Sequence, residues 1–319
     1  MPRFTIHHLT KYIYEAPVRD SANQIVLFPI KDEYQDVVRQ ELKITGDPEL
    51  DIFKDYYGNE VGSFMNAEPH NELLIDSQLE VKTSSRPLPP DDRSKEDQWH
   101  FLYNLRYQLP YMDFLKQEQF DALIEVTQIA DTRLQVEMTP LEAAKLLNKY
   151  VYTNYMYIKG ITSVETTLDE IWKLKAGVCQ DFAHMLLVML RLISIPARYV
   201  SGYICSDKSG LRGEGATHAW VEAYIPFYGW VGLDPTNNCI ANDMHVRLAV
   251  GRNFSDCSPV KGTYKGGSGQ TLEVGVSVSY ESGLTVEEPP TILTQQSSRN
   301  GLEQNSYRRY MEMMQQQQQ

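Results

Sequence analysis

The stretch Ala176-Gly177-Val178-Cys179-Gln180-Asp181-Phe182-Ala183-His184 places a cysteine between a glycine and an apolar run. Apolar residues from Phe182 to Ile193 recur at three- and four-residue spacing, which predicts a buried helix that begins near Cys179. In the first turn of a helix, unpaired N–H groups and the positive end of the helix dipole favour a thiolate over a thiol. Cys179 is therefore either a nucleophile or a buried, inert cysteine, and this stretch is compatible with both.

A second stretch predicts a hairpin. Thr217 to Ile225 alternates as a strand does, and Trp230 to Pro235 alternates again until the proline, which has no N–H to give, ends the strand. With a loop from 225 to 229, His218 lies diagonal to Asp234 on one face, about 7–8 Å away at the backbone. A register shifted by one residue would place the two side chains on opposite faces.

Cysteine, histidine and aspartate can act in nucleophilic catalysis as the nucleophile, the base and the group that orients the base. In this interpretation Cys179 attacks an amide or ester carbonyl, His218 holds the thiolate as an ion pair and protonates the leaving amine, and Asp234 fixes the imidazole tautomer. Each residue alone has a plainer interpretation, His218 as a packed strand histidine and Asp234 as a turn residue. The combination favours catalysis, so we predict these three as the catalytic residues.

Four blocks of sequence carry a family resemblance. They are Gly177-Val178-Cys179-Gln180-Asp181-Phe182-Ala183-His184, Ile195-Pro196-Ala197-Arg198-Tyr199-Val200-Ser201-Gly202-Tyr203, Thr217-His218-Ala219-Trp220-Val221-Glu222 and Leu233-Asp234-Pro235-Thr236. In these blocks the chain resembles the transglutaminase-like superfamily, specifically its bacterial branch described as cysteine proteases. The resemblance implies a papain-like thiol core with Cys179, His218 and Asp234 as its triad. Tyr12 to Val18 and Asp55 to Glu60 look like the N-terminal β region of that branch.

Composition narrows the class of protein. The 319 residues are 42% hydrophobic, enough to bury a full core and usually to form two domains. The 30 basic and 42 acidic residues give a net charge of −12, which argues against nucleic acid as a partner. Without an apolar leader or a membrane-length apolar run, the sequence predicts a cytoplasmic protein with no membrane partner. The four cysteines include no C-x-x-C pair, so we expect no metal site, disulfide framework or cofactor.

The predicted fold class is α+β: a papain-like transglutaminase core, with a central helix packed on an antiparallel sheet, preceded by a small β-sandwich domain. We predict the β domain over residues 1–86, the core over 95–285 and a polar, Gln-rich tail over 286–319, with a stiff linker after residue 86. Capping boxes at Thr139 and Thr167 predict two helix starts. Residues 197–204 and 272–278 are predicted strands, and the Gly-rich residues 206–215 either line a cleft or only connect.

The expected activity is cleavage or transfer of an amide bond in a peptide or other amide substrate, through a thioester on Cys179. Water as the acceptor would make the protein a peptidase or amidase, whereas an amine would make it a transglutaminase. A non-catalytic module that binds peptides or assembles partners on the same fold is the alternative from another class. That alternative predicts a cysteine no more reactive than an ordinary thiol.

Overall fold

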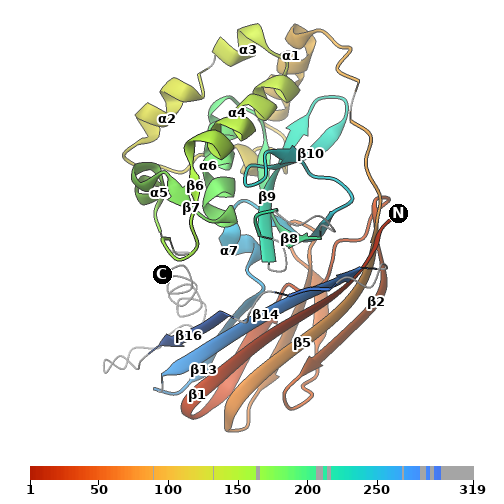
Figure 1. Ribbon diagram of the computed structural model, residues 1–319, viewed down its shortest axis with the longest axis vertical. Coiled ribbons are helices and arrows are strands. Elements are labelled where there is room, and N and C mark those ends of the chain that lie inside the picture. The colour runs from red at the N-terminus through yellow and green to blue at the C-terminus, as the bar shows by residue number, and fades with distance from the viewer. Residues whose placement is uncertain are drawn as a thin grey trace.

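A computed structural model describes residues 1–88, 90–131, 133–162, 166–205, 211–213, 217–267, 269–280, 285–287 and 291–295. Figure 1 shows helices gathered around a small sheet in one half of the molecule and long strands across the other half. Both large sheets are antiparallel. The expected α+β class, a helix-and-sheet core with an N-terminal β region, is confirmed.

Strand β1 (Arg3–Ile25) organises the β region because it pairs along its whole length. Its first part lies between β5 (His70–Thr83) and β14 (Gln270–Tyr280). After a register shift between Ile13 and Val18, its second part lies between β4 (Glu60–Asn66) and β13 (Val260–Lys265). Alternate side chains of β1 are buried, as a strand with one face on a core requires. The remaining strands of this region are β2 (Gln35–Ile44), β3 (Asp51–Lys54), β15 (Thr285–Glu287) and β16 (Thr291–Gln295).

The strand pairing corrects one part of the predicted layout. The sequence places β14 with the core and β16 with the tail, but β14 pairs with β1 and β16 pairs with β14, so both lie in the β region. The physical reason is that an isolated alternating strand leaves its backbone groups unpaired, and β1 offers a long edge that satisfies them. The division into independently folding domains stays a prediction, and the tail beyond residue 295 lies outside the described residues.

The core half is a five-stranded sheet covered by helices. Helix α6 (Cys179–Leu192) is buried on nearly every side, and it packs against β8 and β9 with α4 and α5 beside it. The capping boxes predicted at Thr139 and Thr167 start α4 (Pro140–Asn154) and α5 (Leu168–Leu174). In order across the sheet the strands are β11 (Cys239–Ile240), β10 (Gly229–Asp234), β9 (Thr217–Ile225), β8 (Ala197–Ile204) and β12 (His245–Gly251).

The remaining elements are short. They are α1 (Lys95–Leu105), η1 (Asp113–Leu115), α2 (Leu123–Ile129), α3 (Arg133–Glu137), α7 (Phe254–Cys257) and the parallel pair β6 (Met156–Tyr157) and β7 (Ala176–Gly177). Within the described ranges, no helix combines the length and apolar character needed to cross a bilayer.

Two amide side chains of the β region close the outer edge of the core sheet. Gln35 accepts the Arg247 N–H at 2.8 Å and donates to the Arg247 carbonyl at 2.8 Å. Asn59 does the same with Val250, again with both distances 2.8 Å. Because β12 is an edge strand, these bonds satisfy backbone groups that would otherwise be open to another chain. The two halves are thereby joined by hydrogen bonds as well as by apolar contacts.

Candidate active site

The start of α6 positions Cys179. Tyr157 pairs with Gly177 in the short parallel ladder, and the chain then turns through the extended residue Val178 into the helix. The helix begins at Cys179, as predicted, and the Asp181 carboxylate accepts the Val178 N–H at 2.8 Å. Cys179 therefore stands in the first turn of the helix, and the residue is partly exposed.

Asp181 ties the helix start to the preceding loop. Its Oδ2 accepts a hydrogen bond from the Thr162 hydroxyl at 2.6 Å in addition to the Val178 N–H. Burial raises the pKa of Asp181 to about 6. A Cβ at position 177 would lie 2.3 Å from the same Oδ2, which explains why a glycine precedes the cysteine by two residues.

The hairpin has the predicted register. Leu233 pairs with Val221 and Gly232 with Glu222, so the next position, Asp234, lies opposite residue 220 and diagonal to His218. His218 Nε2 lies 2.9 Å from Asp234 Oδ2, and both side chains are fully buried.

The electrostatics of this pair favour two opposite charges. Burial alone would lower the pKa of His218, but the Asp234 carboxylate outweighs it, and the pKa rises to about 10. Burial likewise opposes the carboxylate, yet the charge of His218 holds the pKa of Asp234 below its ordinary value. Cys179 interacts with the imidazole and adds to the rise in its pKa. His218 Nδ1 is buried and has no hydrogen-bond partner of normal geometry among the described residues. The structure thus brings the three predicted residues together.

Asp234 is held by more donors than the sequence indicated. Oδ1 accepts the N–H groups of Thr236 and Asn237 at 2.8 and 3.2 Å. Oδ2 accepts the Asn237 side-chain amide at 2.8 Å and lies 3.4 Å from His245 Nε2. The order Asp-Pro-Thr-Asn is typical of an aspartate that accepts N–H groups two and three residues later, a signal that could have found the first contacts. Nothing in the local pattern points to His245.

A short described part of the Gly-rich loop lies against His218. The Asn237 side chain accepts the Arg212 N–H at 2.9 Å and donates to the Arg212 carbonyl at 3.2 Å, which fixes this segment beside Asp234. A Cβ on Gly213 would lie 2.6 Å from His218 Nδ1, and the φ of +83° at Gly213 also favours glycine. Residues 211–213 therefore line the site, whereas the rest of the predicted loop, 206–210 and 214–215, lies outside the described residues.

The other acid on the His218 face has a different partner. Glu222 Oε2 lies 2.7 Å from Arg198 Nε and 2.6 Å from Arg198 Nη2, so its partner is an arginine. The ring of Trp220 stacks on His218 with centroids 6.1 Å apart. Asp234 rather than Glu222 is thus the carboxylate that contacts the imidazole, in agreement with the sequence prediction.

Two family models match the chain. Residues 127–235 match the model described as the transglutaminase-like superfamily, and residues 4–82 match the bacterial transglutaminase-like N-terminal region. The first match includes the three residues brought together above, and the second covers the strands from β1 to β5.

Three individual proteins illustrate the similarity. An uncharacterized protein of Mycobacterium leprae is 30% identical over 283 residues, which cover 88% of this chain and 99% of that protein. A Pseudomonas aeruginosa protein-glutamine gamma-glutamyltransferase is 29% identical over 116 residues, 34% of this chain and 17% of that protein. A crystal structure from Cytophaga hutchinsonii, named "a Putative Cysteine Protease", has a TM-score of 0.62 at 20% identity and shares the fold over 95% of this chain and 93% of its own.

Proposed function

We propose that this chain, which belongs to the transglutaminase-like superfamily, is a thiol enzyme that breaks an amide bond with Cys179, His218 and Asp234. One observation carries the proposal. His218 Nε2 lies 2.9 Å from Asp234 Oδ2 in a buried contact, and the same imidazole interacts with Cys179, a cysteine in the first turn of a helix. This is the arrangement of nucleophile, base and orienting acid that thiol catalysis needs.

The proposed first step forms a thioester. The Cys179 thiolate attacks the amide carbon, a C–S bond forms, and the carbonyl oxygen becomes an oxyanion next to the N–H groups at the start of α6. When the oxyanion collapses, the C–N bond breaks and His218 gives its proton to the leaving amine. Asp234 stabilises the charged imidazole before this transfer and keeps its ring in the productive orientation.

The second step decides the reaction class. Water or an amine attacks the thioester carbon, His218 takes a proton from it, and the C–S bond breaks to restore the Cys179 thiolate. With water the product is a free acid and the protein is a peptidase or amidase. With an amine the product is a new amide, an alternative supported by the similarity of part of the chain to a protein-glutamine gamma-glutamyltransferase.

The substrate class and the location follow from the same proposal. We expect a peptide or other amide substrate, because the proposed nucleophile attacks a carbonyl carbon and the proposed acid protonates a leaving amine. The cytoplasmic location stays a prediction, and fractionation of cells that express a tagged chain would test it.

The first experiment is alkylation of the protein by iodoacetamide as a function of pH, with the modified cysteine located by peptide mapping. We expect Cys179 to react well below the midpoint of about 8.5 that a free thiol shows, and His218→Ala to move the midpoint upward. The buried Cys205 and Cys257 serve as internal controls in the same digest. If Cys179 does not react, or reacts as an ordinary thiol in both proteins, the proposal of a thiol enzyme is contradicted. The alternative of a non-catalytic binding module is then favoured.

Casein and a fluorescent primary amine then separate the two acceptors. A hydrolase releases peptides whether or not the amine is present, whereas a transferase attaches the amine to casein. Both signals disappear in Cys179→Ala if the proposed nucleophile is correct. Either signal persisting in Cys179→Ala would contradict the proposal.

A further inference from the structure

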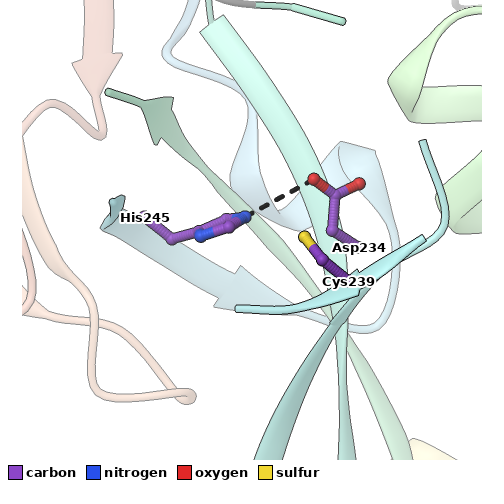
Figure 2. A group of neighbouring side chains, drawn as sticks. All are labelled: Asp234, Cys239 and His245. Atoms are coloured by element: carbon purple, nitrogen blue, oxygen red, sulfur yellow. Dashed lines mark hydrogen bonds and ion pairs between the residues drawn. The ribbon is translucent and has the colours of Figure 1, made fainter. Parts of the chain in front are cut away.

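Three potential metal ligands, Asp234, Cys239 and His245, lie close together beside His218. Cys239 is the strand partner of Asp234 across the turn from β10 to β11, and His245 begins β12. One ligand atom from each of Asp234, Cys239 and His245 lies within 4.8 Å of the other two. Figure 2 shows the carboxylate, the sulfur and the imidazole pointing toward one common space. The three residues come from consecutive strands in sequence, yet they share no metal-binding spacing.

The donor set matches a specific class of ion. A thiolate, an imidazole nitrogen and a carboxylate oxygen are the three side-chain ligands that Zn²⁺ uses, and three protein ligands leave a fourth position for water. With Cys239 and Asp234 ionised and His245 neutral, the ligands carry two negative charges, which a divalent cation balances. Hard ions such as Mg²⁺ and Ca²⁺ prefer oxygen ligands, and only one of these three side chains offers an oxygen, so we expect these ions to bind weakly.

The surroundings of His245 fit a metal ligand as well. Its Nδ1 lies 3.2 Å from the Asn242 side-chain oxygen and 3.2 Å from the Asn242 N–H, so Asn242 offers a partner to either tautomer. A metal-bound histidine usually donates its other N–H to such an oxygen, which fixes the ring. The long contact of 3.4 Å between His245 Nε2 and Asp234 Oδ2 is the weakest bond in the cluster and the one an ion would replace.

A cavity borders His245, one of the three residues of the cluster. It has a volume of about 220 Å³, lies between the core sheet and the β region, and includes Ala241, Asn242 and His245 in its lining. His245 is 6% exposed and lines this cavity, and Cys239 is partly exposed, so an ion can reach the cluster at these two ligands. An entry path is one of the requirements for a metal site.

We propose that Asp234, Cys239 and His245 bind a divalent cation of the zinc class. On binding, the Cys239 thiol proton leaves to solvent, and the His245 proton moves from Nε2 to Nδ1, where Asn242 accepts it. Resting on the proposed function, the second part of the inference is that the ion inhibits the enzyme. Asp234 Oδ2 is the oxygen that contacts both His218 and His245, so an ion on it withdraws the charge that stabilises the imidazolium.

Binding is tested in a protein that lacks the proposed nucleophile. In Cys179→Ala we expect calorimetric titration to find one Zn²⁺ per chain, and Co²⁺ to produce a thiolate-to-metal charge-transfer absorption. Adding Cys239→Ala should abolish that absorption, whereas Cys257→Ala is the matched control and should leave it unchanged. Asn242→Ala should weaken binding by about 10–100-fold, because it removes only the group that orients His245.

Two results would overturn the metal site: no binding to the folded Cys179→Ala protein, or equal binding after Cys239→Ala. Cys239→Ser serves as a second variant if Cys239→Ala does not fold. Because these measurements need no activity, they stand even if no amide substrate is ever cleaved. Inhibition is tested separately, by adding Zn²⁺ to the parent and to Cys239→Ala during alkylation of Cys179. Equal protection in both proteins would mean that the ion acts at Cys179, and the inhibitory role would be wrong.

Discussion

Two buried histidines in the two halves of this molecule have opposite charge preferences. His8 lies in β1, where it is 1% exposed and faces the core sheet. Its Nδ1 lies 2.7 Å from the Tyr203 hydroxyl and its Nε2 lies 3.3 Å from the Thr10 hydroxyl. Burial, with a smaller effect of neighbouring His7, lowers the pKa of His8 to about 4. His8 is therefore neutral near pH 7.

His218 in β9 is buried to the same degree, at 2% exposed, but its neighbour is a carboxylate. Burial again opposes the charge, yet Asp234 raises the pKa of His218 to about 10. The comparison teaches that burial alone does not decide the charge of a histidine in this protein. An ionised partner at hydrogen-bond distance does, because its attraction is strong where water is excluded. A neutral histidine joins the two halves, and a charged one lies in the candidate active site.

The largest expected effect comes from removing the charge that distinguishes the two sites. Asp234→Asn keeps the shape of the side chain but should let the pKa of His218 fall toward that of a buried neutral histidine. We expect kcat/KM for the amide substrate to fall by about 10⁴-fold, the size of effect that loss of an orienting acid has elsewhere. NMR titration of the His218 ring measures the pKa directly.

The control for this variant is Asp76→Asn. Asp76 also lies 2.9 Å from a histidine, His7, but that pair is exposed and far along the sequence from the candidate site. It should leave kcat/KM unchanged. If His218 in Asp234→Asn still titrates near 10, the carboxylate is not the cause of its charge.

The next effect is on stability as a function of pH, and its sign differs for the two histidines. The pKa of His8 falls from 6.5 to about 4 on folding, so its contribution to stability is lost as pH falls through this range. The pKa of His218 rises from 6.5 to about 10, so its contribution is complete below 6.5 and is lost as pH rises toward 10. On these shifts each contribution to the free energy of unfolding should amount to roughly 3–5 kcal/mol.

Urea unfolding of the parent, His8→Gln and His218→Gln over this pH range separates the two contributions. His8→Gln should flatten the profile between about pH 4 and 6.5, and His218→Gln should flatten it between about pH 6.5 and 10. The same change of slope in both variants would contradict the comparison.

The smallest effect tests the neutral site alone. Tyr203→Phe removes the hydroxyl from His8 and leaves a buried ring nitrogen unsatisfied, so the free energy of unfolding should fall by about 1–3 kcal/mol. Cys179 should be alkylated at the parent rate, since the contact between His8 and Tyr203 lies outside the candidate active site. The exposed neighbour provides the matched variant: His7→Ala should change stability by less than about 1 kcal/mol. A large loss in His7→Ala, or slowed alkylation in Tyr203→Phe, would contradict this prediction.

Much of the core could be predicted because its signals are local. The start of α6 at Cys179 follows from a glycine before an apolar run, and the hairpin register follows from alternation on both sides of a short turn. Strand β8 was predicted with the bounds observed, Ala197–Ile204. Each of these elements buries one face, and the apolar residues of that face recur at the helix or strand period. The period can therefore be recognised in the sequence.

The β region was less predictable. The sequence predicts no strand at β4, since Gly62 interrupts its alternation. The glycine is needed because a Cβ there would lie 2.9 Å from Leu50 and 3.0 Å from Ile25. The place of β14 beside β1 was also missed, because about 250 residues separate the paired positions, as in Tyr14 and Gln270. No periodicity within a strand encodes the partner that a distant strand will find.

The sequence by itself determined the elements that carry Cys179, His218 and Asp234 and the face on which the last two lie, because helix and strand periods are local properties of the backbone. Only the tertiary structure decided what surrounds Asp234. Asn237, Cys239 and His245 reach it from a turn and two strands whose spacing follows no motif. Their convergence depends on how the core sheet closes against the β region, and that is set by burial summed over the whole chain rather than by any one stretch.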